Sequence, residues 1–303
     1  MTEPNEGAGT FRSGFVALVG APNVGKSTLL NRMLGDKISI VSPKPQTTRN
    51  RILGVVHRPH GQIVVLDTPG IHRARGGLNR LLVETALAAA SDVDILVFLV
   101  DASRPDPVSE NLVLTSLKAR NRATILAVNK IDLVKKPDLL PLMDRWQKAH
   151  DFQALMPLSA KYGDGVDMLL DTLEAGLPAG PPYFPEDTIS DSPERFIAAE
   201  MVREKVFQLA HQELPYSTAV TIESFVEDPD PPLVRIHAAI HVERDTQKAI
   251  LIGKKGAMLK EIGTRARKEI ESMLGVKVYL ELFVRVEKNW TRDPRAMRRL
   301  GYE

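Results

Sequence analysis

The sequence predicts an α/β domain, in which a mostly parallel sheet is covered by helices on both faces, followed by a smaller α+β domain. Between residues 15 and 175, apolar strand-like runs alternate with helical patterns, which is typical of a parallel sheet. Beyond a proline-rich stretch the order changes to helix, strand, strand, helix, helix, strand, which indicates a three-stranded α+β unit. The 303 residues are enough for two domains of ordinary size.

A proline-rich stretch marks the boundary between the two domains. Residues 178–192 contain four prolines among acidic and small residues, a composition typical of an interdomain linker. The first residues are polar and the last are rich in arginine. We therefore expect a flexible N-terminus (1–12), a first domain (13–177), a linker (178–192), a second domain (193–288) and a basic C-terminal tail (289–303).

The composition excludes several classes of protein. The chain has no cysteine, which rules out disulfides, zinc thiolates and thiol catalysis. Its 40 basic and 38 acidic residues give a net charge of +2, so the distribution of charge is more informative about nucleic-acid binding than the sum. The first 14 residues contain no signal-peptide core, and no apolar stretch has the length of a membrane span. We expect a cytoplasmic protein.

A phosphate-binding motif organises the first domain. Residues 20–27 read G-x-x-x-x-G-K-S, and they join the strand-like run 15–19 to the helical run 27–34. The glycines let the backbone wrap around an anion, while the loop amides and the helix N-terminus supply positive potential. We expect Lys26 to reach the β- and γ-phosphates and Ser27 to bind Mg²⁺. The candidate nucleotide ligands here are Gly20, Ala21, Pro22, Asn23, Val24, Gly25, Lys26, Ser27 and Thr28.

The other elements of the first domain follow from periodicity and turn residues. The runs 35–50 and 71–77 lack a regular pattern, and we interpret both as mobile loops. Strands are predicted at 51–57 and 62–66, paired as an antiparallel hairpin, and at 94–101, 123–128 and 155–158. Helices are predicted at 78–90, 108–119, 139–150 and 165–175.

Further motifs at strand ends indicate a guanine nucleotide. The Asp132 carboxylate can accept both N1–H and the exocyclic NH₂ of guanine, a pair of donors that adenine lacks. Asp67 can hold Mg²⁺ through water, and Thr47 or Thr48 in the mobile loop can close over the metal when a γ-phosphate is present. The order and spacing of the motifs predict a GTPase that binds GTP, GDP and Mg²⁺. The additional candidate ligands are Asp67, Thr68, Pro69, Gly70, Ile71, Asn129, Lys130, Ile131, Asp132, Ser159, Ala160 and Lys161.

Two positions depart from the Ras-like pattern. Ile71 stands where Ras-like enzymes carry the glutamine that orients the attacking water. Asn23 lies inside the phosphate loop, where its side-chain oxygen can either ligate a monovalent cation such as K⁺ beside the β/γ bridge or stabilise the loop. A cation there would supply the positive charge that an arginine finger supplies elsewhere. Asn23 is therefore a candidate catalytic residue together with Lys26.

A second motif lies in the smaller domain. Helices are predicted at 193–211, 246–252 and 257–274, and strands at 219–225, 234–242 and 276–286. Between the last two helices, Gly253-Lys254-Lys255-Gly256 matches the G-x-x-G loop with which KH domains clamp single-stranded nucleotides, although such a sequence is also common in helix–helix turns. Trp290 can either stack on a base or pack against the domain. The candidate RNA-binding residues are Ile252, Gly253, Lys254, Lys255, Gly256, Lys260, Arg265, Lys288, Trp290, Arg292 and Arg295.

These motifs together resemble the Era family of GTPases. The likeness includes the phosphate loop, the run 45–49, Asp67-Thr68-Pro69-Gly70-Ile71, the two guanine motifs, the G-x-x-G loop and the run 290–302, and it covers essentially the whole chain after residue 10. The resemblance implies a P-loop GTPase domain followed by a type II KH domain. It also selects Thr48, with Ser27 and Asp67, for the Mg²⁺ site and gives Thr48 a catalytic role.

The resemblance further implies partners and a location. Members of this family act in assembly of the small (30S) ribosomal subunit and in rRNA maturation, and they bind the 3′ end of 16S ribosomal RNA. They also associate peripherally with the inner face of the cell membrane, a property that this sequence does not reveal. We expect a monomer whose nucleotide state controls RNA binding. The alternative is an RNA-binding module that uses GTP only as a structural ligand.

Overall fold

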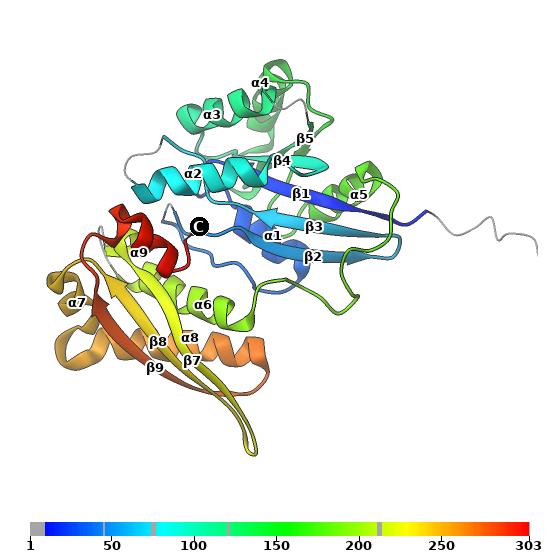
Figure 1. Cartoon of the computed structure of the whole chain (residues 1–303). Coiled ribbons are helices and arrows are strands. Elements are labelled where there is room, and N and C mark those ends of the chain that lie inside the picture. Colours follow the sequence, from blue (N-terminus) through cyan, green and yellow to red (C-terminus); the bar gives the residue numbers. More distant parts are fainter. Residues whose placement is uncertain (1–9, 45, 74–76, 120–121, 211–213, 303) are drawn as a thin grey trace, which may run out of the picture. The chain divides into compact units, whose positions relative to one another are not determined.

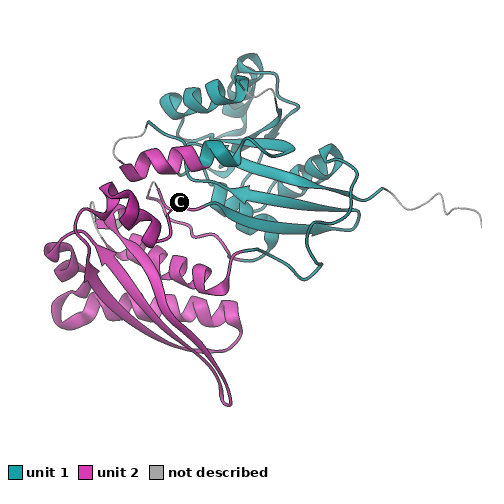
Figure 2. Cartoon of the chain, in the orientation of Figure 1, with its two compact units in different colours: residues 1–36, 51–73, 86–191 teal, residues 37–50, 74–85, 192–303 magenta. Residues whose placement is uncertain are grey.

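The computed structural model describes residues 10–44, 46–73, 77–119, 122–210 and 214–302. The chain forms two compact units, each built from segments that are distant in sequence (Figure 2). The first unit comprises residues 1–36, 51–73 and 86–191, and the second comprises residues 37–50, 74–85 and 192–303. Most of the predicted flexible N-terminus and residues 74–76 of the predicted second loop lie outside the described residues.

A six-stranded sheet forms the first unit, with the strand order β2-β3-β1-β4-β5-β6 (Figure 1). β2 runs antiparallel to β3, and every other neighbouring pair is parallel. This arrangement confirms the predicted hairpin within a mostly parallel sheet. The strands are β1 (Arg12–Gly20), β2 (Ile52–Arg58), β3 (Gly61–Asp67), β4 (Ile95–Asp101), β5 (Ala123–Asn129) and β6 (Ala154–Pro157).

Helices bury both faces of this sheet, which explains its unbroken apolar strands. On one face, Phe98 packs edge-on against Trp146 and joins a cluster that includes residues of α3, α4 and the end of α2. α1 and α5 contact β1 and β3 outside this cluster and cover the other face. The helices are α1 (Lys26–Leu34), α2 (Gly77–Ala89), α3 (Pro107–Lys118), the 3₁₀ turn η1 (Ile131–Leu133), α4 (Lys136–Ala149) and α5 (Val166–Gly176).

The proline-rich stretch belongs to the first unit. Ser13 donates from its backbone to Pro178 O at 3.1 Å and from its hydroxyl to Pro181 O at 2.6 Å. Further along, Val55 N donates to Ile189 O at 2.8 Å. The stretch therefore lies against β1 and β2, and it reaches the second unit only at residue 192.

A three-stranded sheet forms the second unit, with β7 antiparallel to β8 and β8 parallel to β9. Helix α6 contacts β7, and α8 contacts both α6 and β9. Ile236 and Ile240 of β8 and Ile262 of α8 are fully buried. The predicted order of elements is confirmed. The elements are α6 (Glu194–Leu209), η2 (Leu214–Ser217), β7 (Ala219–Pro229), β8 (Pro232–Val242), α7 (Asp245–Ile252), η3 (Lys254–Gly256), α8 (Ala257–Leu274), β9 (Lys277–Val286), η4 (Trp290–Arg292) and α9 (Pro294–Arg299).

Helix α6 is buried over most of its surface, including four charged residues, Glu200, Arg203, Glu204 and Lys205. Arg203 and Glu204 are buried, and the segment 37–50 supplies partners for both. Arg203 donates to Thr47 O, while Glu204 accepts from Val41 N at 2.8 Å. The sequence predicts an irregular and mobile loop here. Its described residues indeed form no helix or strand, but the polar contacts tie it to α6.

The prediction of a basic tail beyond residue 288 is wrong, because this segment folds into η4 and α9. Trp290 is fully buried, donates from Nε1 to Ser217 O at 3.0 Å, and stacks on Tyr302 with 5.5 Å between ring centroids. Ala296, Met297 and Leu300 complete the apolar side of α9. The arginines that suggested a tail lie on the exposed side of this short helix.

Candidate nucleotide site and nucleic-acid groove

The phosphate loop lies between the end of β1 and the start of α1, as predicted. Gly25 has a φ of 102°, and a Cβ at this position would lie 2.3 Å from Asn129 Nδ2. The loop also approaches the Asp67-x-x-Gly70 motif closely, because a Cβ on Gly70 would lie 2.7 Å from the Cα atom of Pro22. Glycine is therefore required at both places, and the sheet edge brings two of the predicted motifs together.

Lys26 is folded back over the loop. Its Nζ donates to Ala21 O at 2.9 Å and to Gly20 O at 3.2 Å. Burial lowers the pKa of Lys26 to about 8, although the nearby Asp67 carboxylate opposes this shift. A buried ammonium at the start of a helix, beside a glycine-bearing loop, is suited to binding phosphate.

Ser27 and Asp67 meet beside this lysine. The Ser27 hydroxyl donates to Asp67 Oδ2 at 2.6 Å, and the Asp67 side chain is completely buried. A hydroxyl and a carboxylate are oxygen ligands suited to Mg²⁺, which binds through one or two protein groups together with substrate phosphates and water. The residues thus fit the predicted metal. Thr48, the third predicted ligand, is a buried residue of the second unit.

The guanine motifs converge around Asn129. Its Nδ2 donates to Val24 O at 2.7 Å, and its Oδ1 accepts from Ala160 N at 2.9 Å and from Lys130 N at 2.8 Å. Asp132 Oδ1 accepts from the Ser159 hydroxyl at 2.7 Å. One amide side chain therefore connects the phosphate loop with both guanine motifs, as the sequence predicts from their positions at strand ends.

Lys130 is fixed by contacts that the sequence analysis did not foresee. Its Nζ donates to Asn23 O at 2.7 Å and to Asp101 Oδ2 at 2.6 Å. Although burial raises it, hydrogen bonds from Lys130 and Ser103 hold the pKa of Asp101 below its ordinary value. The Lys130 ammonium thereby connects the phosphate loop to the end of β4.

Ile71, Asn23 and His72 lie in or beside the loops that are predicted to bind the phosphates. Ile71 is buried in the sheet core, and its N–H bonds to Gly20 O at 3.0 Å, so its side chain has no means of orienting water. Asn23 adopts a φ of 64° and is exposed at the surface of the loop. His72, which the sequence analysis missed, places Nδ1 2.9 Å from Gly70 O.

The G-x-x-G loop has the strained backbone that glycines permit. Gly253 and Gly256 have φ values of 70° and 79°, and a Cβ on Gly253 would lie 2.8 Å from the Cβ atom of Met258. Lys255, between them, also has a positive φ, at 51°. Lys254 and Lys255 are both exposed, so the loop presents two cations on a tight turn between α7 and α8.

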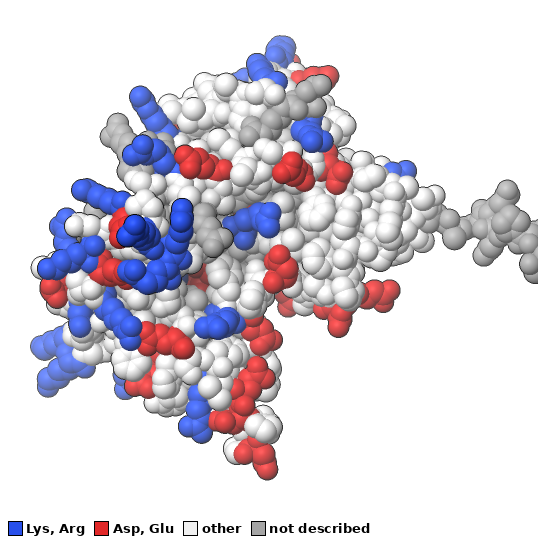
Figure 3. Space-filling model, in the orientation of Figure 1, with Lys and Arg blue, Asp and Glu red and all other residues white. Residues whose placement is uncertain are grey.

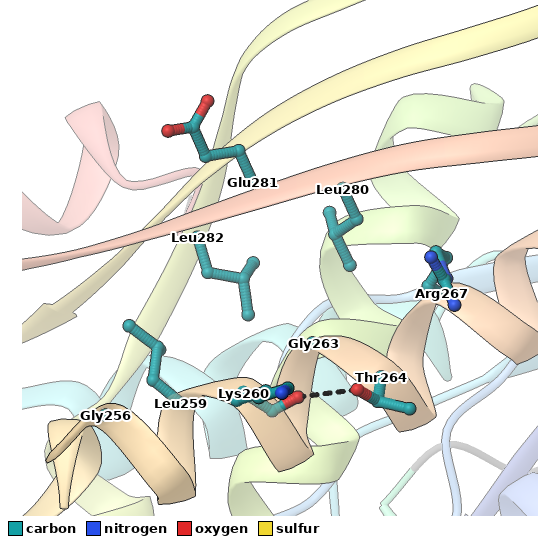
Figure 4. A pocket seen from close by; sticks show the side chains of 9 residues that line it. All are labelled: Gly256, Leu259, Lys260, Gly263, Thr264, Arg267, Leu280, Glu281 and Leu282. Atoms are coloured by element: carbon teal, nitrogen blue, oxygen red, sulfur yellow. Dashed lines mark hydrogen bonds between the residues drawn. The ribbon is translucent and has the colours of Figure 1, made fainter.

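A groove of about 500 Å³ follows this loop along α8 and β9 (Figure 4). Leu280 and Leu282 point from β9 toward α8, whereas Glu281 points away from it. Thr264 and Arg267 also line the groove. Neither is among the predicted RNA-binding residues, although their spacing from Gly256 and Lys260 on one helix face was available as a signal. The lining residues are Gly256, Leu259, Lys260, Gly263, Thr264, Arg267, Leu280, Glu281 and Leu282.

The other predicted RNA-binding residues do not all meet at this groove. Arg265 pairs with Glu261 and is not among the lining residues. Trp290 is buried, so the prediction that it stacks on a base is wrong for this conformation. Lys288, Arg292 and Arg295 are exposed, and Figure 3 shows lysine and arginine side chains gathered on the visible face of the second unit around α7 and α9.

Comparisons with known proteins agree with this geometry. A family model described as a 50S ribosome-binding GTPase matches residues 15–130, and one described as a KH domain matches residues 213–291. The chain is 54% identical over 293 residues to the GTPase Era of Geotalea uraniireducens, covering 97% of this chain and 98% of that protein. It is 53% identical over 292 residues to the GTPase Era of Geobacter metallireducens, covering 96% and 98%.

Two crystal structures are similar over nearly the whole chain. One is Era in complex with MgGDPNP and nucleotides 1506–1542 of 16S ribosomal RNA, with 44% identity, a TM-score of 0.93 and coverage of 96% of this chain and 99% of that chain. The other is a tyrosine-to-alanine variant of Aquifex aeolicus Era bound to GDP.AlF4⁻, with 44% identity, a TM-score of 0.92 and the same coverage.

Fold and site define a P-loop GTPase domain joined to a KH domain. Since more than half of the residues are identical to those of curated Era proteins over nearly their full length, the assignment can be narrower. The chain belongs to the Era family of GTPases. Among the described residues, no helix has both the length and the apolar composition needed to cross a bilayer.

Proposed function

We propose that this chain is a GTP-hydrolysing switch that binds the 3′ end of 16S ribosomal RNA and acts in small-subunit assembly and rRNA maturation. The observation that carries the proposal is the presence, in one chain, of a guanine-nucleotide site and a G-x-x-G groove. The related Era bound to MgGDPNP and to 16S ribosomal RNA supports the choice of both ligands.

The residues of the nucleotide site have separate tasks in this proposal. Lys26 neutralises the β- and γ-phosphates, and the Gly70 amide detects the γ-phosphate. Ser27 and Asp67 would hold Mg²⁺, which would supply positive charge for the developing transition state, and Thr48 is the third ligand that we propose for the GTP-bound form. Because Ile71 is buried in the core, this chain's own side chains contribute by positioning and charge rather than by orienting water.

We also propose that Asn23 ligates K⁺ beside the β/γ bridge. Two observations support this proposal: Asn23 lies in the phosphate loop with a left-handed backbone, φ at 64°, and its side chain is exposed. Hydrolysis should then run faster in K⁺ than in Na⁺ at matched ionic strength. Asn23→Ala should remove the difference, and equal rates in the two salts would contradict the cation role.

In this proposal the groove binds the bases of the RNA, and basic residues in and around it bind the backbone phosphates. Leu280 and Leu282 offer an apolar wall for bases, while Lys254, Lys255 and Arg267 offer charge to the backbone phosphates. Lys288, Arg292 and Arg295 extend the positive surface beyond the groove. We place this binding in the cytoplasm, in a monomer. Association with the inner face of the membrane rests on the family resemblance alone.

The alternative is an RNA-binding module in which GTP is only a structural ligand. The experiment measures GTP turnover with and without an oligonucleotide of the 16S 3′ end. It also measures the affinity for that oligonucleotide with GDP and with a non-hydrolysable GTP analogue. Turnover stimulated by RNA and tighter RNA binding in the analogue form support the switch. Tight binding without turnover supports the alternative, and equal affinity for a scrambled oligonucleotide contradicts the RNA assignment.

A further inference from the structure

An arginine on the phosphate-binding helix contacts the second guanine motif. Arg32 lies on α1, the helix that begins with Lys26 and Ser27. Its Nε donates to Ala160 O at 3.3 Å, and its Nη2 donates to Lys161 O. Both acceptors are main-chain carbonyls on consecutive residues of the guanine motif, 128 and 129 positions away in the sequence.

This contact fixes the direction of the peptide between Ala160 and Lys161, whose N–H can face a bound guanine base. In a trans peptide the carbonyl and the following N–H point in opposite directions, so Ala160 O and the Lys161 N–H lie on opposite sides of one plane. Holding Ala160 O on the side of Arg32 turns the Lys161 N–H to the other side. Ala160 N is already directed toward Asn129 Oδ1 at 2.9 Å, which fixes the peptide before it.

The other hydrogen bonds of this loop hold its two ends, including the bond from Ser159 N to Asp164 O at 2.9 Å. The Ser159 hydroxyl donates to Asp132 and accepts a hydrogen bond from Tyr162 N at 3.3 Å. Gly163 N donates to Ser159 O at 2.7 Å. These bonds hold the start of the turn, whereas the carbonyls of its middle point toward α1. A guanidinium is a planar fork whose N–H groups have fixed directions relative to one another, whereas an ammonium can rotate about its terminal bond.

We infer that Arg32 is a positioning residue for guanine recognition, which holds the 160–161 peptide so that its amide donates to the 6-oxo group of the base. The inference rests on the proposed function, because it presupposes a guanine nucleotide in this site. The role of Arg32 is to raise the selectivity of the site for 6-oxopurine over 6-aminopurine nucleotides and to slow the dissociation of the bound nucleotide. Phosphate binding by Lys26 and Ser27 is a separate task at the other end of the same helix.

The test compares Arg32→Ala with the wild-type protein for GDP, IDP and ADP, using displacement of a fluorescent GDP analogue and its dissociation rate. GDP and IDP share the 6-oxo group and differ only in the 2-amino group that Asp132 reads. We expect both to lose affinity by the same factor, about three- to tenfold, mainly through faster dissociation, while ADP is unchanged. The ratio of GDP to ADP affinity should fall by that factor.

Two further variants make the test specific. Arg122 is a matched control, because this exposed arginine also donates to a main-chain carbonyl, Ser91 O at 3.4 Å, in the same unit, and Arg122→Ala should keep wild-type affinities. Arg32→Lys retains the charge without the fork and should give a partial loss. Wild-type selectivity in either Arg32 variant would overturn the positioning role, and so would equal losses for GDP and ADP. A wild-type protein without preference for GDP over ADP would instead contradict the proposed function itself.

Discussion

The lowered pKa of Lys26 predicts that nucleotide binding takes up a proton. In the nucleotide-free protein, burial holds this pKa at about 8, with the carbonyls of Gly20 and Ala21 as hydrogen-bond acceptors. Bound phosphates add negative charge beside the ammonium and therefore raise the pKa toward or above its ordinary value of 10.5. The protonated form binds the phosphates, so affinity is highest below pH 8 and declines as the pH rises through this value.

The size of the effect follows from the two pKa values. If the bound form stays protonated, the dissociation constant grows in proportion to 1 + 10^(pH − 8). This factor increases about fourfold between pH 7 and pH 8.5, which corresponds to about 0.8 kcal/mol of binding free energy. At pH 8, binding should take up about half a proton per nucleotide. The phosphate groups themselves do not titrate there, because their second ionisation near pH 6 is complete.

Isothermal titration calorimetry measures this uptake directly. GDP is titrated into nucleotide-free protein at pH 8 in buffers with different enthalpies of ionisation, and the slope of the observed enthalpy against buffer enthalpy gives the number of protons. Lys26→Arg is the control, since an arginine stays charged and should take up none, even though its geometry weakens binding. Tight GDP binding without proton uptake in the wild-type protein would refute the lowered pKa of Lys26.

Three further outcomes are expected. Asp132→Asn should weaken GTP binding and admit xanthosine nucleotides, because the amide presents a donor where guanine also donates; unchanged GTP affinity in equilibrium binding would remove Asp132 from the base site. Replacing Lys254 and Lys255 with Asp should abolish RNA retention in a filter-binding assay while GTP affinity persists, since acidic groups repel backbone phosphates. Trp290→Ala should destabilise the second unit by about 3–5 kcal/mol in chemical denaturation, because it empties a fully buried site; a loss below about 1 kcal/mol would contradict that burial.

Local patterns sufficed for most of the fold. Unbroken apolar runs such as that of β4 predict strands buried on both faces, and a phosphate-loop motif between a strand and a helix predicts the start of α1. The meeting of Asn129 with the phosphate loop was also predictable, because parallel strands end at one edge of the sheet. The sequence motifs thus predicted which loops meet at this edge of the sheet.

The sequence could not predict contacts between segments whose residues are of types that are usually exposed. Charged residues such as Glu204 are normally exposed, so nothing in the pattern of α6 predicts that residues 37–50 cover it. An aromatic residue in an arginine-rich run gives no sign of whether it is exposed, and Trp290 proved to be core. Arg32 lies on an exposed helix face and finds its partners near residue 160, a pairing that only the tertiary structure determines.

The anchoring of the segment around Thr48 has an energetic consequence for a switch. Thr47 is bonded to Arg203, and the buried Arg49 donates to Thr218 O at 2.7 Å and Tyr216 O at 2.9 Å. Any displacement of Thr48 toward a ligand strains or breaks such bonds on either side of it, and a buried cation that loses its acceptors is costly. If GTP draws Thr48 out of these contacts, nucleotide binding energy offsets their loss. An effect of RNA on the same contacts would then change nucleotide affinity, and nucleotide would change RNA affinity by the same factor, with a coupling free energy of about 1–3 kcal/mol in typical systems.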